Sequence, residues 1–127
     1  MILLDTDILI DCLRGLPVAG DWLRKSADQV FAIPGIAAME LIVGCRDKAD
    51  LKRTQAFIHQ FDVIWPKALE IRKAFDLLVM YRLEFGVGAP DCIIAAMAMA
   101  HNAHLYTFNL KHYQMFLGLD VRKPYTR

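Results

Sequence analysis

The sequence lacks any long hydrophobic run. Its 127 residues are 56% hydrophobic, yet no stretch approaches the roughly 18 uninterrupted apolar residues that a membrane helix needs. Asp5 and Asp7 break the first apolar run, so we expect neither a signal peptide nor membrane association. The high apolar content therefore predicts a sizeable core and apolar surface that contacts other protein chains.

An excess of charge of one sign is also missing. Fifteen Lys and Arg residues stand against 14 Asp and Glu residues, which leaves a formal net charge of +1. Proteins that hold nucleic acid through their overall charge are strongly basic. Any nucleic-acid binding here must therefore come from a local group of basic side chains.

Cysteine and histidine are few, and their spacing does not suit zinc. Cys12, Cys45 and Cys92 are an odd number, and each lies in an apolar helical pattern. We interpret them as reduced core residues of a cytoplasmic protein. The four histidines form no His-x-x-x-His pair, and no Cys-x-x-Cys motif accompanies them, which argues against a zinc site.

Repeats, low-complexity tracts and linkers are absent, so we expect a single domain over residues 1–127. Short buried strands are predicted at 2–4, 30–33, 61–65, 104–108 and 119–122. Helices are predicted at about 7–15, 16–28, 36–45, 48–60, 66–85 and 91–102, with a short helical turn around 109–116. Strands that alternate with helices predict a mostly parallel sheet covered on both faces, which is a three-layer α/β/α sandwich.

The first predicted strand runs directly into Asp5-Thr6-Asp7. Thr6 or Asp7 would cap the helix that follows, and this structural role explains Asp7 well. It leaves Asp5 unexplained. In parallel α/β sheets, sites form outside the carboxyl ends of the strands, which is where Asp5 lies. Asp5 is therefore a candidate site residue.

Two further acids lie on apolar helical faces. The residues three and four positions on either side of Glu40 are all apolar, so we expect its carboxylate to point toward the core. Asp91 follows Pro90 at a helix start, with an apolar face and no basic residue at i+3 or i+4. The structural alternatives are a glutamate that reaches solvent from a slightly rotated helix, and an ordinary first-turn acid.

Asn109 adds a polar side chain just past the fourth predicted strand, although such a residue is also common in turns and helix caps. Three carboxylates without a local cation repel one another when they converge, so at least one should have a raised pKa. A hard divalent cation such as Mg²⁺ or Mn²⁺ would relieve that repulsion. An ion held in this way can activate water against a phosphodiester.

Four stretches carry a family resemblance, in order, over nearly the whole chain. They are LLDTDILID around Asp5, IPGIAAMELIVGCRD around Glu40, PDCIIAAMA around Asp91 and LYTFNLKHY around Asn109. With these motifs the chain resembles the PIN-domain family, and most of all the VapC toxins of bacterial and archaeal toxin–antitoxin pairs. The resemblance implies a metal-dependent endoribonuclease on a parallel α/β/α sandwich.

The resemblance also implies roles for individual residues. Asp5 and Asp91 would hold Mg²⁺ or Mn²⁺, Glu40 would orient or deprotonate the attacking water, and Asn109 would hydrogen-bond a water on the metal. PIN nucleases often have Asp at the fourth position. Asn109 stands there in this chain, as is common among the toxins, so the resemblance does not decide between one and two metal ions. Thr107 and His112 match a motif that supports this loop, and Asp7 matches a position that is often polar.

Partners follow from the same resemblance. We expect an RNA substrate, a homodimer, and a VapB-type antitoxin that wraps the toxin and covers its site. Basic side chains near the motifs are candidates for phosphate contacts. They are Lys111, Arg46 and Lys48.

Three alternatives differ in function. A haloacid-dehalogenase-type phosphatase also starts with Asp-x-Asp and uses the first carboxylate as nucleophile, but it usually has Thr or Val where Leu9 stands. A response-regulator receiver needs a phosphoacceptor Asp after a central strand, and residues 63–66 offer none. The third alternative is a catalytically idle PIN module that acts only in binding.

Overall fold

The structure is a computed structural model that describes all residues from 1 to 127. Its centre is one five-stranded sheet in the order β3-β2-β1-β4-β5, in which every neighbouring pair is parallel. The strands are β1 (Ile2–Leu4), β2 (Phe31–Pro34), β3 (Asp62–Ile64), β4 (His104–Tyr106) and β5 (Asp120–Arg122).

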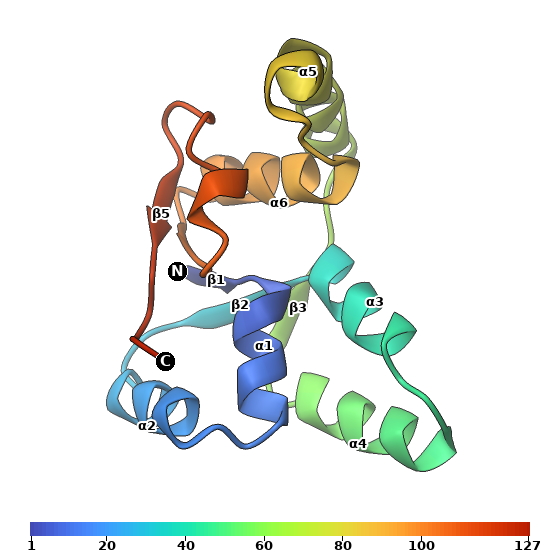
Figure 1. The fold of residues 1–127 in the computed structure, drawn as a ribbon, viewed down its shortest axis with the longest axis vertical. Helices are drawn as coiled ribbons and strands as arrows, with labels where there is room; N and C mark the ends of the chain where they lie inside the picture. The colour runs from blue at the N-terminus through green and yellow to red at the C-terminus, as the bar shows by residue number, and fades with distance from the viewer.

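Six α-helices and one 3₁₀ helix complete the fold. They are α1 (Thr6–Leu13), α2 (Pro17–Lys25), α3 (Gly35–Val43), α4 (Lys48–Ile58), α5 (Ala68–Phe85), α6 (Ala89–Ala100) and the 3₁₀ helix η1 (Leu110–His112). In Figure 1, α5 and α6 lie on one side of the sheet and α1 to α4 lie on the other.

Two apolar clusters join these helices to the sheet. Because side chains alternate along a strand, Leu3 of β1 packs into the cluster that contains most of α6, whereas Ile2 and Leu4 pack into the cluster of α1 and α3. Burial on both faces explains why β1 is apolar throughout. The predicted three-layer α/β/α sandwich with a parallel sheet is confirmed.

The register of the sheet sets where the site forms. Leu4 of β1 pairs with Tyr106 of β4, and the backbone N–H of Asp5 donates to the carbonyl of Tyr106 at 3.1 Å. β1 and β4 therefore end at the same level, and Asp5 and Thr107 leave the sheet as neighbours.

Three predicted helix starts are wrong, and one of them is that of α6, which begins at Ala89 rather than at Asp91. Asp5 itself caps α1, because its carboxylate accepts from the N–H of Thr6, so neither Thr6 nor Asp7 is the cap residue. α5 begins at Ala68 rather than at Pro66. The carboxylate of Glu70 accepts from the N–H of Lys67 at 3.3 Å, which fixes the helix start after Lys67.

The three cysteines are free thiols, as predicted. Only Cys92 is buried in the core, because Cys12 and Cys45 are half-buried and Cys45 lies beyond the end of α3. No helix is both long and apolar enough to span a lipid bilayer. The apolar surplus instead appears as exposed side chains on α5. They include Leu69, Phe75, Val79, Met80 and Leu83.

The last residues fold back onto α1. The Tyr125 hydroxyl donates to the Asp11 carboxylate at 2.9 Å, and the Arg127 guanidinium contacts both oxygens of that carboxylate at 2.9 and 3.0 Å. Arg127 also lies 4.2 Å from the centre of the Phe108 ring. We call these contacts of Tyr125 and Arg127 with Asp11 the C-terminal clamp. Through the contact of Arg127 with Phe108, the clamp holds the segment that follows β4.

Replacing Asp11 with Ala tests the clamp. Asp11 is only 8% exposed, and its loss leaves the partly buried hydroxyl of Tyr125 and the Arg127 guanidinium without their acceptor. We expect the free energy of unfolding in urea to fall by about 2 kcal/mol. Asp21→Ala, which breaks an exposed ion pair with Arg24, should cost much less. If both variants lost the same free energy of unfolding, the clamp would contribute no more to stability than an exposed ion pair.

Candidate active site

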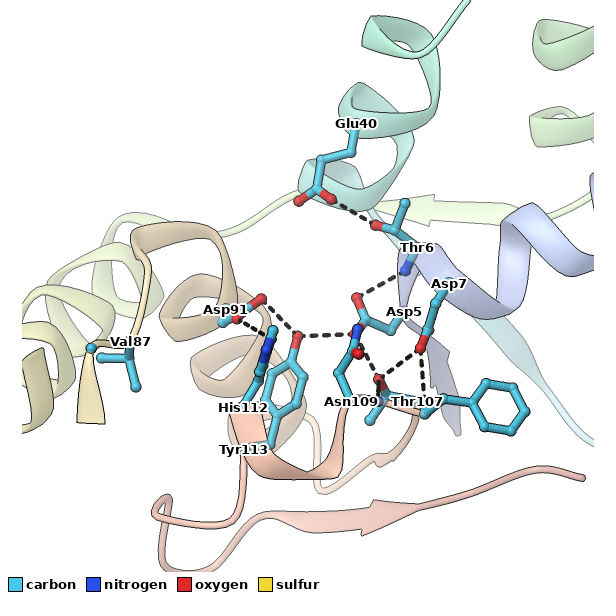
Figure 2. Close-up of polar contacts among 12 residues, drawn as sticks. Asp5, Thr6, Asp7, Glu40, Val87, Asp91, Thr107, Asn109, His112 and Tyr113 are labelled. Carbon is cyan, nitrogen blue, oxygen red and sulfur yellow. Dashed lines mark hydrogen bonds and ion pairs between the residues drawn. The ribbon is translucent and has the colours of Figure 1, made fainter. Parts of the chain in front are cut away.

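Two carboxylates and a buried tyrosine meet at the carboxyl edge of the sheet (Figure 2). Asp5 comes from the end of β1, Asp91 from the first turn of α6, and Tyr113 from the residue that follows η1. The Tyr113 hydroxyl lies 3.2 Å from Oδ2 of Asp5 and 3.1 Å from Oδ1 of Asp91. The structure thus brings together two of the predicted site acids, which are 86 residues apart in sequence.

Tyr113 keeps its proton in this position. It is 1% exposed, and burial together with the two carboxylates raises the pKa of Tyr113 far above its usual value. A hydroxyl carries one proton, so it donates to one of the two carboxylates at a time. The other anionic oxygen then faces the lone pairs of the hydroxyl.

Asp5 has a strongly raised pKa. The pKa of Asp5 rises from 3.8 to about 6, chiefly because the carboxyl is buried and secondly because of the nearby charge of Asp7, while hydrogen bonds from Thr107 and Thr6 oppose the shift. Asp91 has the smallest effect of these neighbours. The predicted raised carboxylate pKa is confirmed, but loss of solvent, rather than repulsion among three site acids, is its main cause.

Thr107 and Asp7 fix the loop after β4. The fully buried Thr107 hydroxyl donates to Oδ2 of Asp5 at 2.8 Å and accepts from the N–H of Asn109 at 3.0 Å. The Asp7 carboxylate accepts from the N–H of Phe108 at 2.8 Å, and burial raises the pKa of Asp7. These contacts fit a supporting role for both residues.

Glu40 does not point toward the core, which corrects the sequence prediction. The buried face of α3 carries Ala37, Ala38 and Leu41, and Glu40 lies outside it in an exposed position. Its carboxylate accepts from the Thr6 hydroxyl at 3.0 Å, and the Thr6 N–H donates to Asp5 at 2.8 Å. Glu40 is therefore joined to Asp5 through one residue, beside the acidic pair (Figure 2).

Asp91 does have a basic neighbour, although none lies nearby in sequence. Nδ1 of His112 is 3.3 Å from Oδ2 of Asp91, and the Asp91 side chain is 28% exposed. His112 belongs to η1, so only the folding of the chain brings it to α6. The local sequence around Asp91 could not reveal this contact.

The remaining candidates lie around the acids. Asn109 is exposed and follows directly after the Thr107–Phe108 loop. Lys111 lines a hollow of about 210 Å³ together with Asp91. Arg46 lines a cleft of about 180 Å³ together with Glu40, whereas Lys48 lines neither.

The donor set fits a hard divalent cation. No group of three His, Cys, Asp or Glu side chains is arranged to hold a metal ion, and the sequence prediction assigned the metal to two carboxylates, Asp5 and Asp91. Mg²⁺, however, is commonly held by one or two carboxylates plus waters and substrate phosphates. Asp5 and Asp91 supply two carboxylates that share the Tyr113 hydroxyl. Oxygen donors of this kind suit Mg²⁺ or Mn²⁺ rather than zinc.

Sequence reasoning missed two residues that link the acids. Tyr113 ends the LYTFNLKHY stretch, and its ring packs in the core while its hydroxyl reaches the site. Thr6 was predicted as a helix cap rather than as a partner of Glu40. A polar tip on an otherwise apolar residue within a site motif was the available signal for Tyr113.

Comparison with known proteins decides the family. The family model for the PIN domain matches residues 2–115. The chain belongs to the PIN-domain family. The sequence resemblance to this family is thereby confirmed, and the phosphatase and receiver alternatives are wrong.

Several relatives of this PIN domain carry names that describe an activity. Ribonuclease VapC10 of Mycobacterium tuberculosis is 36% identical over 118 residues, which cover 91% of this chain and 88% of the relative. Ribonuclease VapC19 of the same species is 33% identical over 130 residues, 98% of this chain and 100% of the relative.

Solved structures show the same fold. One chain of a toxin–antitoxin complex from Klebsiella pneumoniae superposes with a TM-score of 0.79 at 31% identity, over 100% of both chains. A chain of VapBC2 from Rickettsia felis, bound to a promoter DNA fragment, gives a TM-score of 0.78 at 23% identity, over 97% of this chain and 98% of that chain.

Proposed function

We propose that this PIN domain is a metal-dependent endoribonuclease and the toxin of a VapBC-type toxin–antitoxin pair. The observation that carries the proposal is the pair of carboxylates, Asp5 and Asp91, on one buried tyrosine hydroxyl at the carboxyl edge of the sheet. Support comes from relatives at 36% and 33% identity that are named ribonucleases.

The chain's own residues would divide the chemistry of phosphodiester hydrolysis. Asp5 and Asp91 would hold Mg²⁺ or Mn²⁺, which supplies positive charge to the scissile phosphate. Glu40 would accept a proton from the attacking water, and the Thr6 hydroxyl would orient the Glu40 carboxylate from 3.0 Å. Asn109 would hydrogen-bond a water at the site.

The test is cleavage of RNA by the purified protein. We expect cleavage in Mg²⁺ or Mn²⁺, none in excess EDTA, and recovery when metal is added back. Persistent cleavage in EDTA would contradict metal dependence. Intact RNA under all conditions would favour the idle binding module.

For partners, we propose a homodimer and a VapB-type antitoxin. The exposed apolar side chains of α5 provide surface for protein contacts, and the acidic pair would attract a basic side chain from an antitoxin. The Klebsiella relative at 31% identity comes from a toxin–antitoxin complex. Light scattering at micromolar concentration should give the mass of a dimer, and a monomer mass would refute the homodimer.

Tyr113→Phe tests how the acids are positioned. The variant keeps the buried ring but removes the hydroxyl shared by Asp5 and Asp91, so the two carboxylates lose their common contact. We expect Mn²⁺ affinity, measured by calorimetry, to fall by about 10- to 100-fold. Tyr81→Phe is the matched control, because Tyr81 is half-buried and packs on Phe116 away from the acids. Unchanged Mn²⁺ affinity in Tyr113→Phe would assign Tyr113 to packing alone.

A further inference from the structure

A hollow of about 210 Å³ opens directly beside Asp91. It lies between the end of α5, the loop that joins α5 to α6, and the segment around η1. Asp91, which belongs to both the hollow and the acidic pair, joins the two. Whatever occupies the hollow therefore lies next to the reacting centre.

One wall of the hollow is apolar and aromatic. It is formed by Phe85, Val87 and Met115, and the Phe85 side chain is 45% exposed. Gly86 ends α5 with a φ of +70°, a conformation that favours glycine. Arg82 then donates to the carbonyls of Gly86 and Val87, each at 2.8 Å, and so fixes the loop.

A series of ring contacts supports Phe85 from behind. The ring centres of Phe85 and Tyr81 are 5.9 Å apart, those of Tyr81 and Phe116 are 5.6 Å apart, and those of Phe116 and Tyr113 are 6.2 Å apart. The last ring carries the hydroxyl that contacts Asp5 and Asp91. The aromatic wall is thus built on the same packed core as the acids.

Another part of the lining is basic. Lys111 and His112 of η1 line the hollow, and Lys111 is exposed without an acidic partner. An aromatic side chain and a cation that line one hollow are the combination with which proteins hold single-stranded RNA, because bases stack on rings and phosphates pair with Lys or Arg.

Two larger hollows do not combine these features. A cleft of about 470 Å³ at the start of α4 is lined by Arg46, Asp47, Asp50 and Arg53, and Arg53 is already paired with Asp50 at 2.8 Å. An apolar groove of about 440 Å³ between α3 and α4 has no Lys or Arg in its lining and does not include the site acids.

We propose that the hollow beside Asp91 binds one nucleotide that flanks the scissile phosphate, with its base against Phe85 and its phosphate at Lys111. The inference rests on the proposed ribonuclease function and deepens it. The base pocket would give the enzyme a sequence preference at that nucleotide, since the pocket wall contacts one base rather than the backbone alone.

Cleavage of a random-sequence RNA pool, with cut sites mapped by sequencing, tests the base contact. Wild type should show a base preference at one position next to the cut. Phe85→Ala should flatten that preference and lower kcat/KM on the preferred sequence roughly 5- to 150-fold. Leu117→Ala, which truncates an 86% exposed residue outside the lining of the hollow, should keep both the base preference and kcat/KM. An unchanged preference in Phe85→Ala would overturn the base contact.

Salt dependence of RNA binding in EDTA tests the phosphate contact independently of cleavage. A labelled single-stranded RNA 12-mer should bind Lys111→Gln more weakly, and the slope of log K against log salt should fall by about 0.7, as expected for one phosphate on a single strand. Lys25→Gln, an exposed lysine on α2, should keep the wild-type slope. A wild-type slope in Lys111→Gln would overturn the phosphate contact.

The two proposals fail in different ways. If the wild type cleaves no RNA with any metal, the ribonuclease function is wrong. If the wild type cleaves with a base preference that Phe85→Ala retains, the function stands and the nucleotide pocket is wrong. Thermal melts of each variant check that Phe85→Ala and Lys111→Gln are folded.

Discussion

Asp91→Asn should lower kcat/KM for RNA cleavage by roughly a thousandfold or more, while the chain still folds. The substitution keeps the shape of the side chain, and its amide oxygen can still accept from the Tyr113 hydroxyl. It removes one of the two negative charges that would hold the metal, and a bound cation contributes several kcal/mol to stabilising the transition state.

The measurement is single-turnover cleavage of a labelled RNA in saturating Mg²⁺. Asp76→Asn is the matched control, because it makes the same chemical change at an exposed position on α5, and it should cleave like the wild type. If Asp91→Asn kept more than a tenth of wild-type activity, Asp91 would not be a metal ligand required for catalysis.

Asp5→Asn should stabilise the metal-free protein at neutral pH and lose this advantage in acid. The pKa of Asp5 rises from 3.8 to about 6 on folding, so the folded chain holds this proton more tightly than the unfolded chain. Stability from the protonated carboxyl is full below about pH 4 and is lost as the pH rises through 6. The difference between the folded and unfolded pKa of Asp5 lowers the free energy of unfolding by about 3 kcal/mol at pH 7.5 relative to pH 4.

Urea unfolding in EDTA at pH 4 and pH 7.5 measures this effect. The gain of Asp5→Asn over wild type should be largest at pH 7.5 and should not exceed about 3 kcal/mol. Asn can still cap α1, so the helix start survives the change. Asp28→Asn, an exposed control, should change neither value. If the free energy of unfolding of Asp5→Asn were instead more than about 1 kcal/mol lower than that of wild type at pH 7.5, the main role of Asp5 would be to cap α1.

The sequence predicted the part of the site that depends on the ends of strands. An apolar run that stops at Asp5 marks the end of β1, and the fourth strand was predicted at 104–108, two residues past the observed end of β4 at Tyr106. In a parallel sheet these ends must share one edge. Local patterns in the sequence therefore placed Asp5 and Asn109 at the same edge of the sheet, although they did not show that Thr107 already lies outside β4.

The orientation of Glu40 could not be predicted in the same way. Its apolar neighbours at three and four positions suggested a buried face, but two of them, Val43 at 85% exposure and the exposed Gly44, face away from the core. An apolar face that serves protein contacts has the same periodicity as one that serves the core. Periodicity alone therefore cannot tell which way Glu40 points.

Contacts between distant residues were also beyond the sequence. The Tyr113 hydroxyl meets Asp91, and Phe85 and Lys111 line one hollow, only because α5, α6 and η1 pack together. The raised pKa of Asp5 likewise comes chiefly from burial, which depends on the whole fold. Such features require the three-dimensional arrangement of elements that are each ordinary by themselves.

Calorimetric titration of Mn²⁺ into the wild type, Asp5→Asn and Asp91→Asn tests most directly whether these two acids hold the metal on which RNA cleavage depends. We expect the wild type to bind Mn²⁺ and each variant to bind it at least tenfold more weakly, since each has lost one of two carboxylate ligands. Equal Mn²⁺ affinity in all three proteins would contradict the assignment of Asp5 and Asp91 as metal ligands.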